Sequence, residues 1–153
     1  MKNYEERIEE LGIEIPEPPE PVGSYIPARK ASNLVFCSGQ GPLKGEKFLH
    51  LGKVGSDLTV KEGYEAARMC AINCLAEIKS EIGSLNKVDK IIKVRGFVSS
   101  APGFGKQPDV INGASKVLQE IFGENGKHTR AALGTSELPG NIPVEVEMVV
   151  SVK

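Results

Sequence analysis

Tryptophan is absent from this chain of 153 residues, and aromatic side chains make up only 5% of it. So few rings leave few surfaces on which the bases of single-stranded nucleic acid could stack. An excess of charge of one sign is also missing, because 19 lysines and arginines nearly balance 20 aspartates and glutamates. Domains that hold a nucleic-acid backbone usually carry a basic excess. The composition therefore disfavours nucleic acid as a partner.

Long apolar runs and paired cysteines are missing too. No run approaches the ~20 residues of a membrane-spanning helix. The acidic N-terminus MKNYEERIEELGIEIPEPPEP lacks the basic and apolar segments of a secretory signal. Cys37, Cys70 and Cys74 form neither an even set nor a CxxC pair. We expect reduced thiols that serve as small core residues, in a soluble, cytoplasmic protein that does not contact a membrane.

The length fits one domain of ordinary size with an added arm. Residues 1–21 are expected to form this N-terminal arm. It consists of a short helix over 3–11, which ends at Gly12, and of extended chain through the proline-rich segment 16–21, because proline disfavours helix. Residues 22–153 then form the domain proper.

Hydrophobic periodicity in the domain predicts two long helices among several strands. Apolar residues recur every three or four positions in the helical segments and alternate in the strands. This order predicts an α+β fold with a mixed β-sheet and both long helices on one face. The other face mixes apolar and charged residues, so we expect further subunits to cover it. The expected elements are strands at 34–38 and 48–54 that pair as a hairpin, a helix at 60–82, a strand at 88–100, a helix at 109–122, and strands at 129–136 and 144–152.

Several common kinds of site are excluded by residue spacing. The sequence GFGK at 103–106 is followed by Gln-Pro, whereas a phosphate-binding loop continues with Ser or Thr. His50 and His128 are the only histidines, and neither has a second histidine or a cysteine at metal-ligand spacing. No serine stands in a GxSxG turn. We therefore expect no metal ion and no cofactor.

Charged residues inside the last two apolar strands form the remaining candidate. Arg130 begins one strand, and Glu145 and Glu147 alternate with valines in the other. One interpretation is that Arg130 pairs with one of these acids across adjacent antiparallel strands and holds their register. The other is that its planar fork receives the carboxylate of a small acid, while a carboxylate on the neighbouring strand orients or deprotonates water. The residues alone leave both interpretations open, as well as which acid meets Arg130.

Five separated motifs, in this order, are similar to those of one family. They are Gly23 with Tyr25, Ser38-Gly39-Gln40, Asn112 in the second long helix, Arg130 at a strand start, and Leu138-Pro139 before VEVE. The segments SYIPARKASNLVFCSGQGP, KVRGFVSS, VINGASKVLQEIFG and HTRAALGTSELPGNIPVEVEM together resemble the Rid family. These are the reactive intermediate deaminases, also called YjgF-like or endoribonuclease L-PSP proteins. The resemblance covers about residues 22–152.

The resemblance implies a chorismate-mutase-like fold assembled as a homotrimer, with a central β-barrel and clefts between subunits. It also implies a hydrolase that converts small 2-imino or 2-enamino acids to 2-keto acids and ammonia without metal or cofactor. By position, Arg130 binds the carboxylate of this metabolite, and Glu145 serves the hydrolytic water as the second catalytic residue. The substrate-binding set that the resemblance implies is Tyr25, Ser38, Gly39, Asn112, Arg130 and Ala132.

Ala132 departs from the family pattern, because the typical deaminase has a cysteine two residues after the arginine. This departure keeps a second function open, in which the trimer binds a carboxylate metabolite without turnover and acts as a regulator. Endoribonuclease activity follows from the family label and is the weaker alternative, since the charge balance and the few aromatic residues disfavour it.

Overall fold

The computed structural model describes residues 3–153. It contains α-helices, β-strands and short 3-10 helices (η), and several of the predicted boundaries are met within one residue. In chain order the elements are α1 (Tyr4–Glu10), β1 (Ala28–Ala31), β2 (Leu34–Gln40), β3 (Leu43–Lys44), β4 (Lys47–Phe48), α2 (Val60–Ile82), η1 (Leu85–Lys87), β5 (Val88–Ser99), α3 (Gln107–Phe122), η2 (Gly123–Gly126), β6 (Thr129–Thr135), η3 (Pro139–Asn141) and β7 (Val144–Val152).

Five strands form the main sheet in the order β1-β2-β7-β5-β6. β6 runs parallel to β5, and the other neighbouring pairs are antiparallel. The sheet is therefore mixed, as the sequence predicts. Its edges are β1 and β6, so two strands separate β2 from β6. β3 and β4 form a small hairpin of their own.

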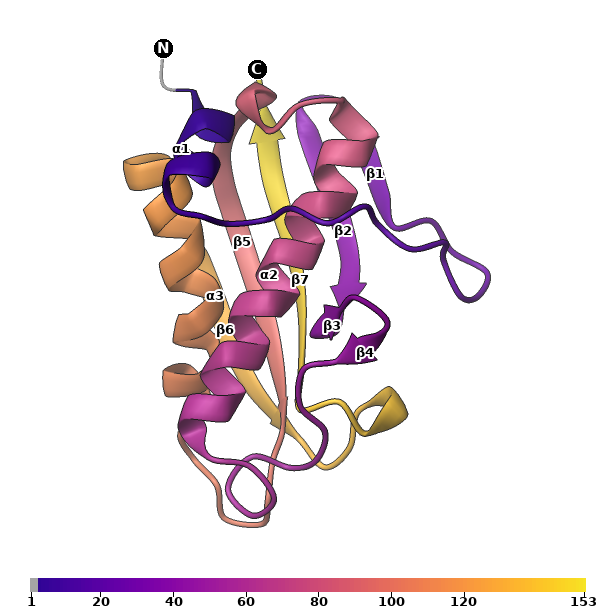
Figure 1. Cartoon of the computed structure of the whole chain (residues 1–153), viewed down its shortest axis with the longest axis vertical. Coiled ribbons are helices and arrows are strands. Elements are labelled where there is room, and N and C mark those ends of the chain that lie inside the picture. The colour runs from indigo at the N-terminus through magenta and orange to yellow at the C-terminus, as the bar shows by residue number, and fades with distance from the viewer. Residues whose placement is uncertain (1–2) are drawn as a thin grey trace.

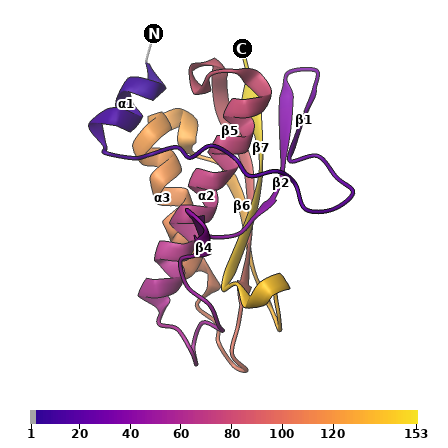
Figure 2. The ribbon, with the colours of Figure 1, turned by 45° about the vertical axis from the view of Figure 1, so that its right-hand side comes forward.

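Both long helices cover one face of this sheet. Figure 1 shows α2 and α3 side by side in front of the strands, and Figure 2 shows both on the same side of the sheet. The even-numbered residues of β7, from Val144 to Val152, are buried beneath them, whereas Glu145 and Glu147 point to the opposite face and are only partly buried. The predicted arrangement of one sheet and two helices is thus confirmed. No helix within residues 3–153 combines the length and the apolarity needed to cross a membrane.

The N-terminal segment packs on the helical layer. α1 places Tyr4 and Ile8 in the core, with 3% and 5% of their surfaces exposed. The Tyr4 ring meets the edge of Phe122 in α3, with 4.7 Å between ring centroids. The chain then crosses α2 before it reaches β1 (Figure 1). The arm therefore extends the hydrophobic core of the domain.

The region between β2 and α2 differs from the expected hairpin. A strand over 48–54 that pairs with β2 was expected, and this is wrong. Only Lys47–Phe48 is extended there, and it pairs with β3. β1 was not expected either, because its sequence ARKA lies at an edge, is mostly exposed and has no apolar alternation.

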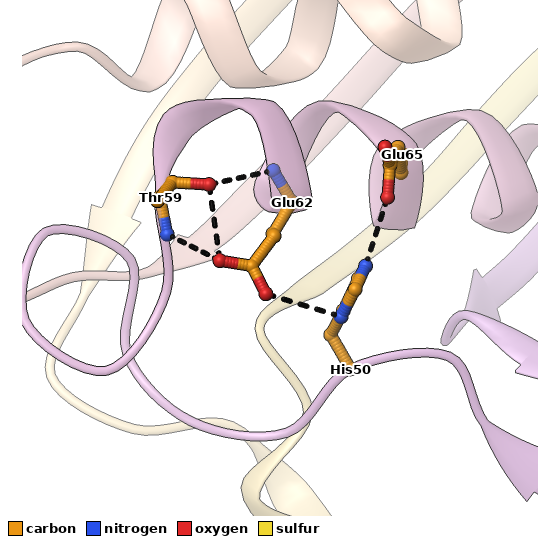
Figure 3. A network of polar contacts seen from close by, with 4 residues as sticks. All are labelled: His50, Thr59, Glu62 and Glu65. Carbon is orange, nitrogen blue, oxygen red and sulfur yellow. Dashed lines mark hydrogen bonds and ion pairs between the residues drawn. The ribbon is translucent and has the colours of Figure 1, made fainter.

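The start of α2 is fixed by a reciprocal cap. The Thr59 hydroxyl accepts a hydrogen bond from the Glu62 backbone N–H at 3.1 Å, and the Glu62 carboxylate accepts one from the Thr59 backbone N–H at 3.0 Å. The bond from the Thr59 N–H, and a second bond that the Thr59 hydroxyl donates to the same carboxylate at 3.0 Å, lower the pKa of Glu62. His50 lies between Glu62 and Glu65 and ties the preceding loop to the first turns of the helix (Figure 3).

Gly113 allows α2 and α3 to approach each other closely. A Cβ at this position would clash with the backbone carbonyl of Tyr64 in α2, and backbone has little freedom to move aside. We expect Gly113→Ala to lower the free energy of unfolding by about 3 kcal/mol, because the helices must separate to admit one methyl group. Chemical denaturation measures this. Gly105→Ala, at a position with open space around it, is the matched control and should change stability little.

Candidate functional site

Arg130 lies in the edge strand β6 and points toward the helical layer. It pairs with Val94 of β5, and its Nη1 donates hydrogen bonds to two side chains of α3. These are the Asn112 carbonyl oxygen at 2.8 Å and the Ser115 hydroxyl at 3.1 Å. Arg130 remains exposed to solvent. Both bonds are donated by Nη1, so the other two nitrogens of the guanidinium make no hydrogen bond to residues 3–153.

Asn112 and Ala132 complete this first group of candidate residues. Asn112 orients the guanidinium directly, as its 2.8 Å bond indicates. Ala132 follows Arg130 by two positions and so lies on the same face of the strand. It is partly buried and packs against the core. The structure therefore brings together Asn112, Arg130 and Ala132, which the resemblance assigns to one site.

Glu145 lies on the opposite face of the sheet, in β7. It is directly across from Phe97 of β5 and lies against Gly39 of β2. A Cβ at Gly39 would be 3.0 Å from the carboxyl carbon of Glu145, so the absence of a side chain makes room for this acid. Burial raises the pKa of Glu145, and the negative charge of Glu147 raises it further. A carboxyl group with a raised pKa is well suited to exchange protons near neutral pH.

The second group also includes Ser38, which directly precedes Gly39 in β2, and Tyr25, which lies in the loop before β1, near the other edge of the sheet. The Ser38 hydroxyl donates a 2.8 Å hydrogen bond to the Ile26 carbonyl, and the Ser38 N–H donates one of 2.8 Å to the Pro27 carbonyl. These bonds hold the loop that precedes β1 against β2. Tyr25 is in that loop and is half exposed. A hollow of about 470 Å³ adjoins Ser38 and is lined in part by Ile26, Phe36, Arg95 and Glu147.

The candidate residues thus form two groups that one chain keeps apart. The expectation that Arg130 and Glu145 occupy neighbouring strands is wrong, because β5 lies between β6 and β7. They also point to opposite faces of the sheet. Glu147 pairs with Arg95 of β5 at 2.9 Å. Structural pairing of Arg130 with either acid is therefore absent among residues 3–153, and Glu147 instead holds register between β5 and β7.

Two contacts near Arg130 were not anticipated from the sequence. Ser115 is 7% exposed and bonds to both Arg130 and His128. His128 in turn bonds to the Gly126 carbonyl at 2.6 Å. A histidine two positions before the arginine is the only signal in the sequence, and without the helix packing it does not point to Ser115.

The three cysteines behave as core residues, as expected. Cys37, Cys70 and Cys74 are free and buried. Burial raises the pKa of Cys70 and of Cys74 well above that of an ordinary thiol, which keeps both thiols protonated and unreactive.

Comparison with known proteins identifies the family. Residues 5–150 match the family model described as "YjgF/chorismate_mutase-like, putative endoribonuclease", so the chain belongs to the YjgF family that its motifs resemble. Protein TCP17 of Trypanosoma cruzi is 35% identical over 144 residues, which are 94% of this chain and 90% of that protein. A 2-iminobutanoate/2-iminopropanoate deaminase of Dermatophagoides farinae is 25% identical over 141 residues, or 92% of this chain and 95% of that protein.

One solved structure is similar over nearly the whole length of this chain. The crystal structure of Atu1372 from Agrobacterium tumefaciens, a protein described as having unknown function, is similar with a TM-score of 0.90 at 40% identity. The similarity covers 98% of this chain and 92% of that one. The family match shows that the fold is the chorismate-mutase-like fold of the YjgF family.

Proposed function

We propose that the protein hydrolyses small 2-imino and 2-enamino acids to 2-keto acids and ammonia. The observation that carries this proposal is the Arg130 guanidinium, which Asn112 and Ser115 hold from one side while its other side is open. An oriented arginine with free N–H groups is a natural receptor for a planar carboxylate. Family membership, and the relative named as a deaminase, support the same chemistry.

The proposed reaction needs only positioning and proton transfer. Arg130 holds the substrate carboxylate, and Glu145 takes a proton from water as the oxygen bonds to the imine carbon and the C=N electron pair moves to nitrogen. Glu145 returns the proton to nitrogen and gives a carbinolamine. In a second transfer it removes the hydroxyl proton, the C–N bond breaks, and ammonia leaves with the returned proton. One water is consumed and a 2-keto acid is formed.

We further propose that each site forms between copies of the chain, in a homotrimer with a central β-barrel. The two groups of candidate residues support this, because Arg130 is on one edge strand and Ser38, Gly39 and Glu145 are toward the other edge and on the opposite face. The face without helices also exposes apolar side chains. Phe36 is 48% exposed, a large fraction for an apolar side chain, and a second copy could cover it.

The direct test generates 2-iminopropanoate or 2-iminobutanoate in situ and follows release of the keto acid. The protein should accelerate release above the spontaneous hydrolysis rate. An unchanged rate, with protein that is folded and has the expected oligomeric mass, would contradict the proposed function.

Ala132 favours one alternative, in which the same site binds a carboxylate metabolite without turnover. In that case keto acids should raise the melting temperature of the protein, and imine hydrolysis should remain at its spontaneous rate.

We also propose that the protein is cytoplasmic. Its cysteines are free and buried, which is consistent with a reducing compartment.

A further inference from the structure

We infer that Ser115 and His128 form a hydrogen-bonded relay that positions the Arg130 guanidinium. The relay runs from the Gly126 carbonyl to His128 Nδ1 at 2.6 Å, from His128 Nε2 to the Ser115 hydroxyl at 2.9 Å, and from that hydroxyl to Arg130 Nη1 at 3.1 Å. Its importance for turnover rests on the proposed function, in which Arg130 receives the substrate carboxylate. Ser115 and His128 act through Arg130, so they are positioning residues.

The chemistry of each group fixes which partner donates and which accepts in every hydrogen bond of the relay. The Gly126 carbonyl can only accept, so His128 Nδ1 must donate to it. In a neutral imidazole the other nitrogen, Nε2, then has no proton and accepts. The Ser115 hydroxyl must therefore donate to Nε2, which turns its lone pairs toward Arg130 Nη1, a group that can only donate. In this one arrangement, each donor of the relay faces an acceptor.

The fold places the parts of the relay independently of Arg130. Ser115 is nearly buried in α3. Gly126 ends η2, and a Cβ there would clash with the Leu118 backbone carbonyl. Only glycine lets η2 pack this closely on α3 and present its carbonyl to His128. The relay is therefore built from α3 and η2, and Arg130 reaches it from β6.

The neutral imidazole that the relay requires is favoured by its surroundings. Burial lowers the pKa of His128, the Gly126 carbonyl opposes this shift, and the positive charge of Arg130 lowers the pKa again. Arg130 is the charged group that faces the ring from β6, while η2 presents a carbonyl and α3 a hydroxyl. Protonation would convert Nε2 to a donor, so the Ser115 hydroxyl could no longer donate to it. It would also place a second positive charge beside Arg130.

Nitrogen-15 NMR of the histidine ring tests the relay without any assay of turnover. Neutral His128 should carry its proton on Nδ1 and titrate below the ordinary value of about 6.5. Loss of the Arg130 charge in Arg130→Ala should raise the midpoint of this titration, and the control Arg68→Ala, which removes an arginine of α2 that pairs with Glu120, should not. A proton on Nε2, or a midpoint that Arg130→Ala does not move, would overturn the relay.

The kinetic arm compares two replacements of the ring. His128→Phe keeps an aromatic ring but offers no acceptor to Ser115, so we expect the KM for 2-iminobutanoate to rise about tenfold with a smaller change in kcat. His128→Gln offers an amide oxygen near the position of Nε2 and does not titrate. It should restore most of the affinity. We expect KM of wild-type protein to rise as the pH falls through the His128 titration, and His128→Gln should abolish this rise.

The two arms separate failure of the relay from failure of the proposed function. Absence of turnover in wild-type protein, with the NMR results as expected, would contradict the deaminase proposal and leave the relay supported. Normal turnover with equal KM in wild type, His128→Phe and His128→Gln would contradict the positioning role. If His128→Phe fails to fold, Ser115→Ala interrupts the relay one step closer to Arg130, because it removes the hydroxyl that accepts from Arg130 Nη1, and it should raise KM as well.

Discussion

Arg130→Ala is expected to lower kcat/KM for 2-iminobutanoate by about 10³-fold, since it removes two charge-assisted hydrogen bonds to the substrate carboxylate. Arg130 is exposed, and water can replace it as a donor to Asn112, so the free energy of unfolding should change little. Arg130→Lys keeps the charge but loses the planar fork, and it should recover only part of the activity. Release of keto acid from the imine generated in situ measures the activity of wild type, Arg130→Ala and Arg130→Lys.

Arg68→Ala is the matched control for this substitution. It removes an arginine that makes one surface ion pair with Glu120 on the helical layer, at 3.2 Å, and such pairs contribute little. Its activity should equal that of wild type. If Arg130→Ala were as active as Arg68→Ala, the proposed role of Arg130 in the reaction would be contradicted.

Glu145→Gln is expected to lower kcat by about 10²-fold or more, because a glutamine cannot move protons between water and the substrate nitrogen. Wild-type activity should fall as the pH drops through the raised pKa of Glu145, since the carboxylate form is the base. Glu147 contributes to that raised value. Glu147→Gln should therefore shift the acidic limb of the pH profile to lower pH while activity at neutral pH persists.

The raised pKa of Glu145 has a consequence for stability with a definite sign. The folded state binds the proton more tightly than the unfolded state, so this group stabilises the fold below its ordinary pKa, and the contribution is lost as the pH rises through the raised value. Near neutral pH the ionised, half-buried acid opposes folding. Glu145→Gln should thus unfold at an equal or higher denaturant concentration than wild type while it loses activity. Lower stability together with unchanged activity would contradict both roles.

Local patterns predicted the helices well because the signals that end them are local. α2 was expected at 60–82 and is found at Val60–Ile82, where a capping box begins it and Gly83 follows it. β5 and β7 were also placed closely. The pairing of strands depends on residues far apart in sequence, and the parallel alignment of β6 with β5 could not be inferred from either strand alone. That pairing is what separates Arg130 from Glu145.

The candidate site shows the same division between local and distant information. Motifs in the sequence marked Arg130, Asn112 and Glu145, and the 2.8 Å bond now joins the first two. Ser115 carried no signal, because it acquires its contacts only when α3 packs beside β6. A register shift between Ile91 and Lys93 also turns Ile92 outward, which no alternating pattern predicts.

The central claim is that Arg130 of one copy and Glu145 of another form one site, and mixed oligomers test it most directly. Arg130→Ala and Glu145→Gln are each expected to be nearly inactive alone. When the two are co-expressed and assemble at random in a trimer, about a quarter of the interfaces should unite an intact arginine with an intact glutamate, and about a quarter of wild-type activity should return. Activity no greater than that of either variant alone would contradict the claim.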